Sequence, residues 1–76
     1  MKWQDYIVIN PGVRSGKPCV SGTRITVTDV LEYLASGMDE AAILADFPEL
    51  RHEAIQAVLA FAAERERRLN ALPVAS

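Results

Sequence analysis

Cationic side chains set among glycines, near the start of the chain, are the first residues whose types and spacing suggest a chemical role. Glycine lets a backbone approach a ligand closely, and cationic side chains neutralise phosphate groups. The alternation therefore indicates a phosphate-binding segment, with solubility as the alternative explanation of the same charges. The residues are Gly12, Arg14, Gly16, Lys17, Gly22 and Arg24.

Part of this segment, Gly12–Pro18, resembles a nucleotide-binding P-loop. Its glycines are separated by three residues, one fewer than that motif requires. Pro18 stands where the motif has a magnesium-binding Ser or Thr, and it removes a backbone amide that would cradle phosphate. The pattern around it is not that of a strand leading into a long helix. We therefore expect no nucleotide hydrolysis.

The cysteine and histidine content of the chain indicates neither covalent catalysis nor metal binding. The chain has one cysteine, Cys19, and one histidine, His52, and they stand 33 positions apart. Nothing in the sequence places a base beside Cys19, and its neighbours Pro18 and Val20 favour a small buried strand residue. One cysteine and one histidine form neither an internal disulfide nor a structural zinc site. We expect no enzyme activity, no metal and no cofactor.

A second group of candidate residues begins the last helix that the sequence predicts. Arg51, His52 and Gln56 would lie in its first two turns, after a four-residue connection typical of a helix-turn-helix. In such modules this part of the helix enters the major groove, where Gln pairs with adenine and Arg with guanine. Glu49 and Glu53 flank these residues and would repel phosphate. A three-helix fold without a DNA role is therefore the alternative.

The composition predicts one small folded domain, residues 1–76. Hydrophobic residues make up 50% and charged residues 24% of the chain, which is a globular balance. No apolar run approaches the ~20 residues of a membrane span, and the first residues lack the apolar core of a secretory signal. We therefore expect a cytoplasmic protein. A core of this size supplies only ~3–5 kcal/mol, so we expect self-association or a protein partner to add to it.

Short strands and basic turns are predicted over residues 1–26. Residues 6–9 are β-branched and aromatic, and Asn10-Pro11-Gly12 ends them. A ribbon of this length is marginal alone, so it must lie on helices or pair with a second copy. From Val27 the apolar spacing becomes helical. It predicts helices over residues 27–37, 39–47 and 51–69 and a frayed tail over residues 70–76.

Local signals support these helix ends. Thr26 and Asp29 have the spacing of a capping box, although Thr28 is a competing cap. Gly37 suits the position after a helix, and Pro48 disfavours helix in the residue before it. The sequence thus predicts a mostly α fold, with a short N-terminal β-ribbon followed by a three-helix bundle that contains a helix-turn-helix.

The formal charge of −2 is unevenly distributed along the chain. Residues 1–28 carry a balance of +3, residues 29–63 a balance of −6, and residues 64–76 a balance of +1. Basic and acidic faces on one small body can serve two different partners. A solvated surface of mixed charge is the alternative.

Four segments form a combination that is specific as a set. They are residues 9–13 (INPGV), 16–27 (GKPCVSGTRITV), 34–38 (LASGM) and 43–50 (ILADFPEL). Together they resemble family 433 of the domains of unknown function, over about residues 6–64. The resemblance implies a homeodomain-like trihelical fold and an antitoxin of the VapB type, encoded beside a PIN-like toxin nuclease. Arg51 departs from the family's pattern, which usually has a Ser or Thr helix cap near this position.

The resemblance and the charge pattern lead to one expected function. The chain would be an antitoxin that binds operator DNA through the basic segment and the last helix, and that masks its toxin with the acidic middle and the Ala57, Ala60 and Ala63 face. A homodimer would form through the N-terminal strands or the last helix. The alternatives are a protein-interaction module and a solitary transcriptional regulator with no toxin partner.

Overall fold

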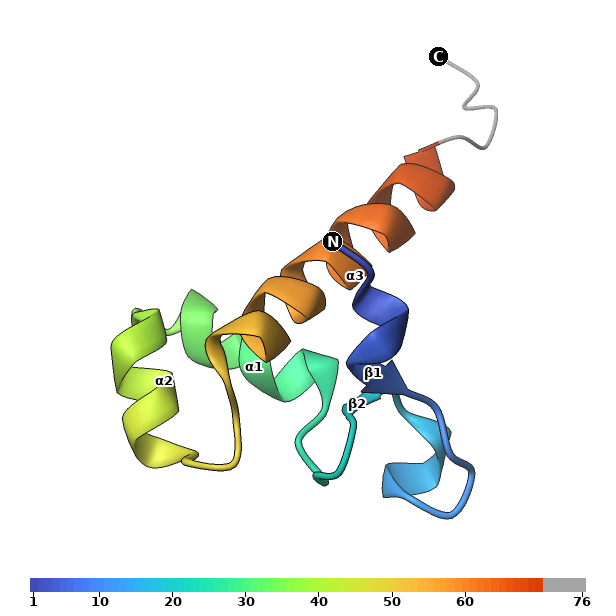
Figure 1. The fold of residues 1–76 in the computed structure, drawn as a ribbon. Coiled ribbons are helices and arrows are strands. Elements are labelled where there is room, and N and C mark those ends of the chain that lie inside the picture. The colour runs from blue at the N-terminus through green and yellow to red at the C-terminus, as the bar shows by residue number, and fades with distance from the viewer. Residues whose placement is uncertain (71–76) are drawn as a thin grey trace.

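The computed structural model describes residues 1–70 of the chain, with the side chain of the last of these excepted. It confirms the mostly helical fold: a two-stranded antiparallel ribbon is followed by three helices that pack together (Figure 1). The predicted frayed tail lies outside the described residues, apart from Asn70, which ends the last helix. The elements are the 3-10 turn η1 (Trp3–Asp5), β1 (Ile7–Val8), the 3-10 turn η2 (Arg14–Gly16), β2 (Cys19–Val20), α1 (Val27–Ala35), α2 (Glu40–Asp46) and α3 (His52–Asn70).

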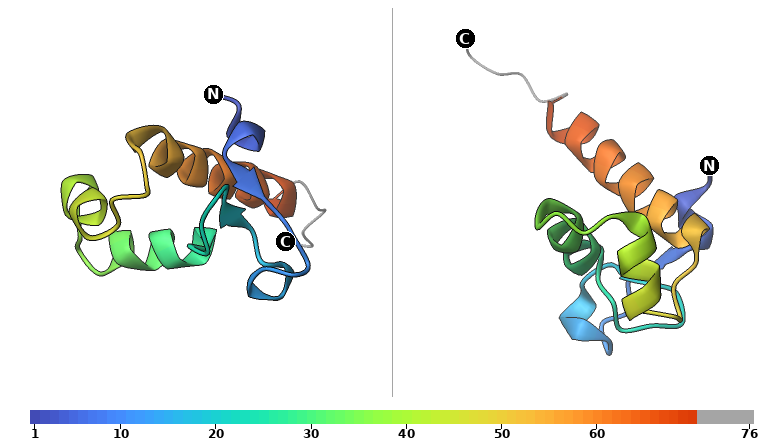
Figure 2. Two further views of the ribbon diagram at one scale, coloured as in Figure 1. Left: turned by 60° about the horizontal axis from the view of Figure 1, so that its bottom comes forward. Right: turned by 90° about the vertical axis from the view of Figure 1, so that its left-hand side faces the viewer.

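The N-terminal ribbon lies on the helices. In it Ile7 pairs with Val20 and Val8 with Cys19. Ile7, Cys19 and Val20 are buried, whereas Val8 is exposed on the other side of its strand. Figure 2 shows the ribbon lying beside α3, which agrees with the contacts between β1 and α3. This packing supports a ribbon that is too short to be stable alone.

Caps at both ends define α1. The Thr26 side chain accepts a hydrogen bond from the Asp29 N–H, and the Asp29 carboxylate accepts one from the Thr26 N–H, which is a complete capping box. At the other end the Gly37 N–H donates to the Leu34 carbonyl, and the Met38 N–H to the Tyr33 carbonyl. Gly37 has a φ of 100°, so the helix ends in a Schellman motif. The helix is therefore two residues shorter than the predicted 27–37.

A sharp connection separates α2 from α3. Asp39 caps α2 through a bond from the Ala42 N–H, and Phe47 leaves the helical conformation immediately before Pro48. These two residues, which the sequence assigns to the helix, are its caps. The Leu50 N–H then donates to the Phe47 carbonyl and closes the turn. Helix α3 begins at His52, one residue after the predicted start.

One hydrophobic core joins the ribbon to the three helices. Val30 from α1, Ile43 from α2 and Val58 from α3 are completely buried at its centre. On α3 the buried residues end at Phe61, and the C-terminal half of the helix extends beyond the other elements (Figure 1). Within residues 1–70, no helix has the length and apolar character needed to cross a membrane.

Candidate nucleic-acid interface

Two of the predicted phosphate-binding residues are exposed and have no partner for their side chains among the described residues. Lys17 follows η2, and Arg24 lies in the turn between β2 and α1. The backbone around them is tightly turned, because Gly16 and Gly22 both have a φ of 79°. These turns hold both cationic side chains on the N-terminal side of α1.

Arg14 has a different environment from the other two. Its Nη1 donates to the Arg24 carbonyl at 2.9 Å and forms an ion pair with the Asp29 carboxylate at 3.3 Å. Asp29 is also the acidic residue of the α1 capping box. Arg14 therefore fastens the basic loop, residues 12–24, to the start of α1, and its charge is already matched by a carboxylate.

The environment of Asp29 favours its ionised form. The Thr26 backbone N–H, which donates to this carboxylate, holds the pKa of Asp29 below its ordinary value of 3.8. Partial burial opposes this effect, and the Thr26 side chain and Arg14 lower the pKa further. The carboxylate thus stays charged at neutral pH and keeps Arg14 in place.

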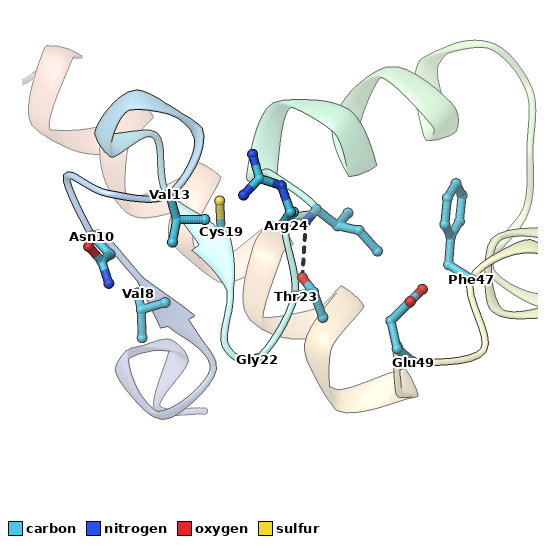
Figure 3. A pocket seen from close by; sticks show the side chains of 10 residues that line it. Val8, Asn10, Val13, Cys19, Gly22, Thr23, Arg24, Phe47 and Glu49 are labelled. Carbon is cyan, nitrogen blue, oxygen red and sulfur yellow. Dashed lines mark hydrogen bonds between the residues drawn. The ribbon is translucent and has the colours of Figure 1, made fainter.

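A hollow of about 700 Å³ lies between the ribbon and the connection from α2 to α3. In Figure 3, Val8 and Asn10 lie on one side of it and Phe47 and Glu49 on the other. Arg24 lies between them. The loop that carries Arg24 and the α2–α3 turn therefore border the same open surface.

The first turns of α3 are exposed at the end of this connection. Arg51, His52 and Gln56 all lie on the surface, whereas Ala54 and Ile55 face the core. The side chains of Arg51 and Gln56 have no partner among the described residues. The start of the helix is thus open to solvent, as a DNA-reading helix requires.

His52 is the member of this group that is already engaged. Its Nδ1 pairs with the Oε1 atom of Glu40, the first residue of α2. This contact links the beginnings of α2 and α3. A carboxylate therefore already occupies one ring nitrogen of His52.

Acidic residues surround the start of α3. Glu49 and Glu53 are exposed on either side of Arg51, and Glu40 is paired with His52. Three carboxylates therefore lie near Arg51, the one arginine or lysine of this helix start. This balance makes the helix start less favourable for an anion than the surroundings of Lys17 and Arg24, which form no ion pair among the described residues.

The small-residue face that the sequence offers to a toxin is only partly on the surface. Ala57 is completely buried in the core, Ala60 is half-buried and Ala63 is exposed. Because α3 turns Ala57 toward the centre of the molecule, that residue is unable to contact a partner. Of the three alanines, only Ala60 and Ala63 are accessible to a partner.

The two residue types with catalytic potential lie in separate environments. Cys19 is buried in β2, and its Sγ donates to the Lys17 carbonyl at 3.3 Å. His52 is on the surface and is paired with Glu40. In the part of the chain that the structure describes, no group of three His, Cys, Asp or Glu residues is placed to hold a metal ion.

Sequence reasoning missed the role of the N-terminal aromatic residue. Trp3 packs edge-on against Phe61, with ring centroids 4.8 Å apart, and its Nε1 donates to Glu64. These partners are separated by about sixty positions along the chain, so no local pattern indicates them. The amphipathic character of Trp3 was the one available signal, since an indole that packs in a core usually seeks a partner for its N–H.

A family model described as "Protein of unknown function (DUF433)" matches residues 7–62. The chain is also similar to the crystal structure of a DUF433 member protein from Anabaena variabilis ATCC 29413, with a TM-score of 0.79 and 28% sequence identity. The match covers 88% of this chain and 66% of that chain, so this chain spans a little under two thirds of its length. The comparison with curated proteins gave no match.

Proposed function

The chain belongs to the DUF433 family, whose function is unknown, and from this premise we propose that it is a DNA-binding antitoxin. In this proposal a homodimer binds operator DNA through the α2–α3 unit and the basic N-terminal loop. It also neutralises a toxin nuclease of the PIN type, in keeping with the family resemblance in its sequence.

One observation carries the DNA-binding part of the proposal. Arg24 and two residues of the α2–α3 turn, Phe47 and Glu49, line the same hollow. Arg51, at the start of α3, follows Glu49 by two positions in the chain. A duplex lying against this surface would meet Arg24 and Lys17 with its phosphates while Arg51 and Gln56 approach the base edges. Phosphate contacts would set the position, and base contacts would set the sequence preference.

The acidic residues suit the second partner. Glu49 and Glu53 disfavour nucleic acid near the helix start, but they favour a protein surface that is basic. Because the same carboxylates border the proposed DNA surface, toxin binding and DNA binding would influence each other.

A DNA-binding measurement tests the proposal directly. We expect the chain to bind a duplex taken from the region upstream of its own gene, with an affinity that falls steeply as salt rises. The double variant Lys17→Glu and Arg24→Glu should bind at least roughly tenfold more weakly, and the salt slope should flatten by roughly one for each phosphate that is no longer neutralised.

A matched control separates the local effect from the change in net charge. Lys2→Glu combined with Arg67→Glu changes the charge by the same amount at two exposed positions, and the helical spacing places Arg67 on the face of α3 opposite Arg65 and Leu69. This control should retain most of the affinity. Equal losses in the two double variants would contradict a specific role of Lys17 and Arg24.

A protein-interaction module that binds no nucleic acid is the second candidate. The acidic surroundings of the α3 start favour it, since Glu49, Glu53 and Glu40 outnumber the cations there. This candidate predicts no binding to the upstream duplex even at low salt, together with a stable complex with the product of a neighbouring gene. A shift of the duplex that Lys17→Glu and Arg24→Glu abolish would exclude it.

A further inference from the structure

One face of α3 is buried against the core in the first half of the helix and exposed to solvent in the C-terminal half. Ala54, Val58 and Phe61 face the core, and the same helical spacing leads on to Arg65 and Leu69. Leu69 is 62% exposed. The face that is buried in the first half of the helix is therefore left exposed in the second half by the described residues, and there it carries both the charged Arg65 and the apolar Leu69.

Two hollows run along this uncovered half, one on each side. One, of about 390 Å³, is lined by Trp3, Ile9, Pro18 and Phe61 among others. The other, of about 340 Å³, is lined on its apolar side by Val27, Leu31, Phe61, Ala62 and Leu69. Phe61 contributes to both, so the two hollows meet at the point where the core ends.

From these features we propose that the C-terminal half of α3 is the dimer interface, and that it packs antiparallel against the same segment of a second copy. In a two-fold dimer, residue i of one copy faces residue j of the other, and residue j faces residue i. A surface that binds its own copy must therefore be complementary to itself.

The charges of this segment satisfy that condition. Glu64 and Arg68 lie one turn apart on one flank of the helix, where they form an ion pair at 3.3 Å within one chain. In an antiparallel pair centred near residue 66, Glu64 of each copy faces Arg68 of the other. Each carboxylate then gains a second cation, because the intrahelical pair is retained.

The apolar flank has a centre within half a residue of this one. Ala62 and Leu69 both line the second hollow, and they lie at nearly equal distances from residue 66. In the same antiparallel register, the large Leu69 side chain of one copy would lie over the small Ala62 of the other. Small residues opposite large ones allow two helices to approach closely.

Arg65 lies beside the two-fold axis, where two copies would bring like charges together. Its guanidinium lies over the ring of Phe61, 5.6 Å from the centroid, which is one turn toward the start of the helix. This position directs the charge of each copy away from the axis. The contact with Phe61 thus reduces the repulsion at the centre of the pair.

The proposed dimer has a consequence for DNA that rests on the proposed function. From residue 66 back to His52 is 14 positions, so the two α3 starts would lie about 40 Å apart along the helix axes. Half-sites one helical turn apart are separated by ~34–36 Å. The register thus places the two helix starts at roughly the spacing of successive major grooves.

Charge exchange between the two copies tests the interface without DNA. The full chain should sediment as a dimer, and Glu64→Arg or Arg68→Glu should each raise the dimer dissociation constant at least roughly tenfold, because each places like charges opposite one another. An equimolar mixture of the two variants should form a heterodimer, since the all-basic flank then faces the all-acidic one. If either residue acted only within its own chain, mixing the two variants would not restore dimer formation.

Glu64→Arg also removes the acceptor of the Trp3 indole N–H, so the folding of this variant must be checked by circular dichroism. Substitutions of leucines on α3 supply a second, independent measurement. Leu69→Glu should give a monomer. Leu59→Glu is the matched control, since Leu59 is 47% exposed on another face of α3 and should leave the dimer intact. A monomeric full chain, a mixture that stays monomeric, or a dimer that Leu69→Glu does not affect would overturn the proposal.

Discussion

Arg14 ties the basic N-terminal loop to the first turn of α1 through a single guanidinium group. Its Nη1 reaches both the Arg24 carbonyl and the Asp29 carboxylate. Asp29 in turn accepts the Thr26 N–H that closes the capping box. One carboxylate therefore supports a helix cap and a loop, so the stability of both should depend on its charge.

We expect acid to weaken this arrangement. The pKa of Asp29 in the folded protein lies below its ordinary value of 3.8, chiefly because the Thr26 N–H donates to the carboxylate. A carboxyl group of this kind stabilises the native state fully above pH 3.8, and its contribution is lost as the pH falls through the lower, folded-state pKa. Urea unfolding measured as the pH is lowered through this region should show a fall in the free energy of unfolding of the wild type. The fall should be smaller in Asp29→Asn, which has no carboxylate at this position to protonate. Asp5→Asn, at an exposed carboxylate in η1, should behave as the wild type does.

Glu49 offers a residue-level test of the DNA surface. It lies across the hollow from Arg24 and would repel a phosphate bound there. We expect Glu49→Gln to raise the affinity for the upstream duplex several-fold at low salt, by an electrostatic effect that disappears at high salt. Glu32→Gln, at an exposed position on α1, should change the affinity little. A lower affinity in Glu49→Gln would count against DNA at this surface.

The sequence identifies candidate residues by type, but it does not identify their partners. Lys17 and Arg24 are exposed, as a binding residue must be. The partners of Arg14 and His52 lie 15 and 12 positions away, in other elements. Only the tertiary fold creates these ion pairs, so the sequence does not distinguish an engaged cation from a free one.

At the scale of elements, helix ends were accessible to sequence reasoning because caps are local. The capping box spans Thr26 to Asp29, and the Schellman motif spans Tyr33 to Met38. Each depends on a few neighbouring residues with distinct preferences. The pairing of β1 with β2 depends instead on burial against α3, which no local pattern contains.

Gly37 provides a prediction at this scale. An L side chain is strained at a φ of 100°, yet an added Cβ would meet no atom within 4 Å. Gly37→Ala should therefore lower the free energy of unfolding by about 1–2 kcal/mol through backbone strain alone. Gly12→Ala is the matched control, because Gly12 lacks a positive φ and its Cβ would make only an ordinary contact with Asn10. Denaturant midpoints that fall equally in both variants would contradict this explanation.

At the scale of the whole molecule, the N-terminal segment closes the fold against its last helix. Trp3 packs edge-on against Phe61 and donates to Glu64, while Ile7 and Val20 extend the same packing into the core. The apolar periodicity of the sequence predicts the three helices of the bundle, but it does not predict these N-terminal contacts. This closure joins the N-terminal segment to the middle of α3, about sixty positions away, so local patterns do not predict it.

A double-mutant cycle measures how strongly the N-terminal segment and α3 are coupled. We expect Trp3→Leu and Phe61→Leu to interact by about 0.5–1.5 kcal/mol in the free energy of unfolding, because the edge-to-face arrangement exists only when both rings are present. That is a large share of the ~3–5 kcal/mol that a core of this size supplies. The control cycle pairs Trp3→Leu with Phe47→Leu, whose ring stacks on Tyr33 instead, and these two changes should be additive. Additive effects in both cycles would mean that the N-terminal segment covers α3 without specific packing, and the fold would then depend on the helices alone.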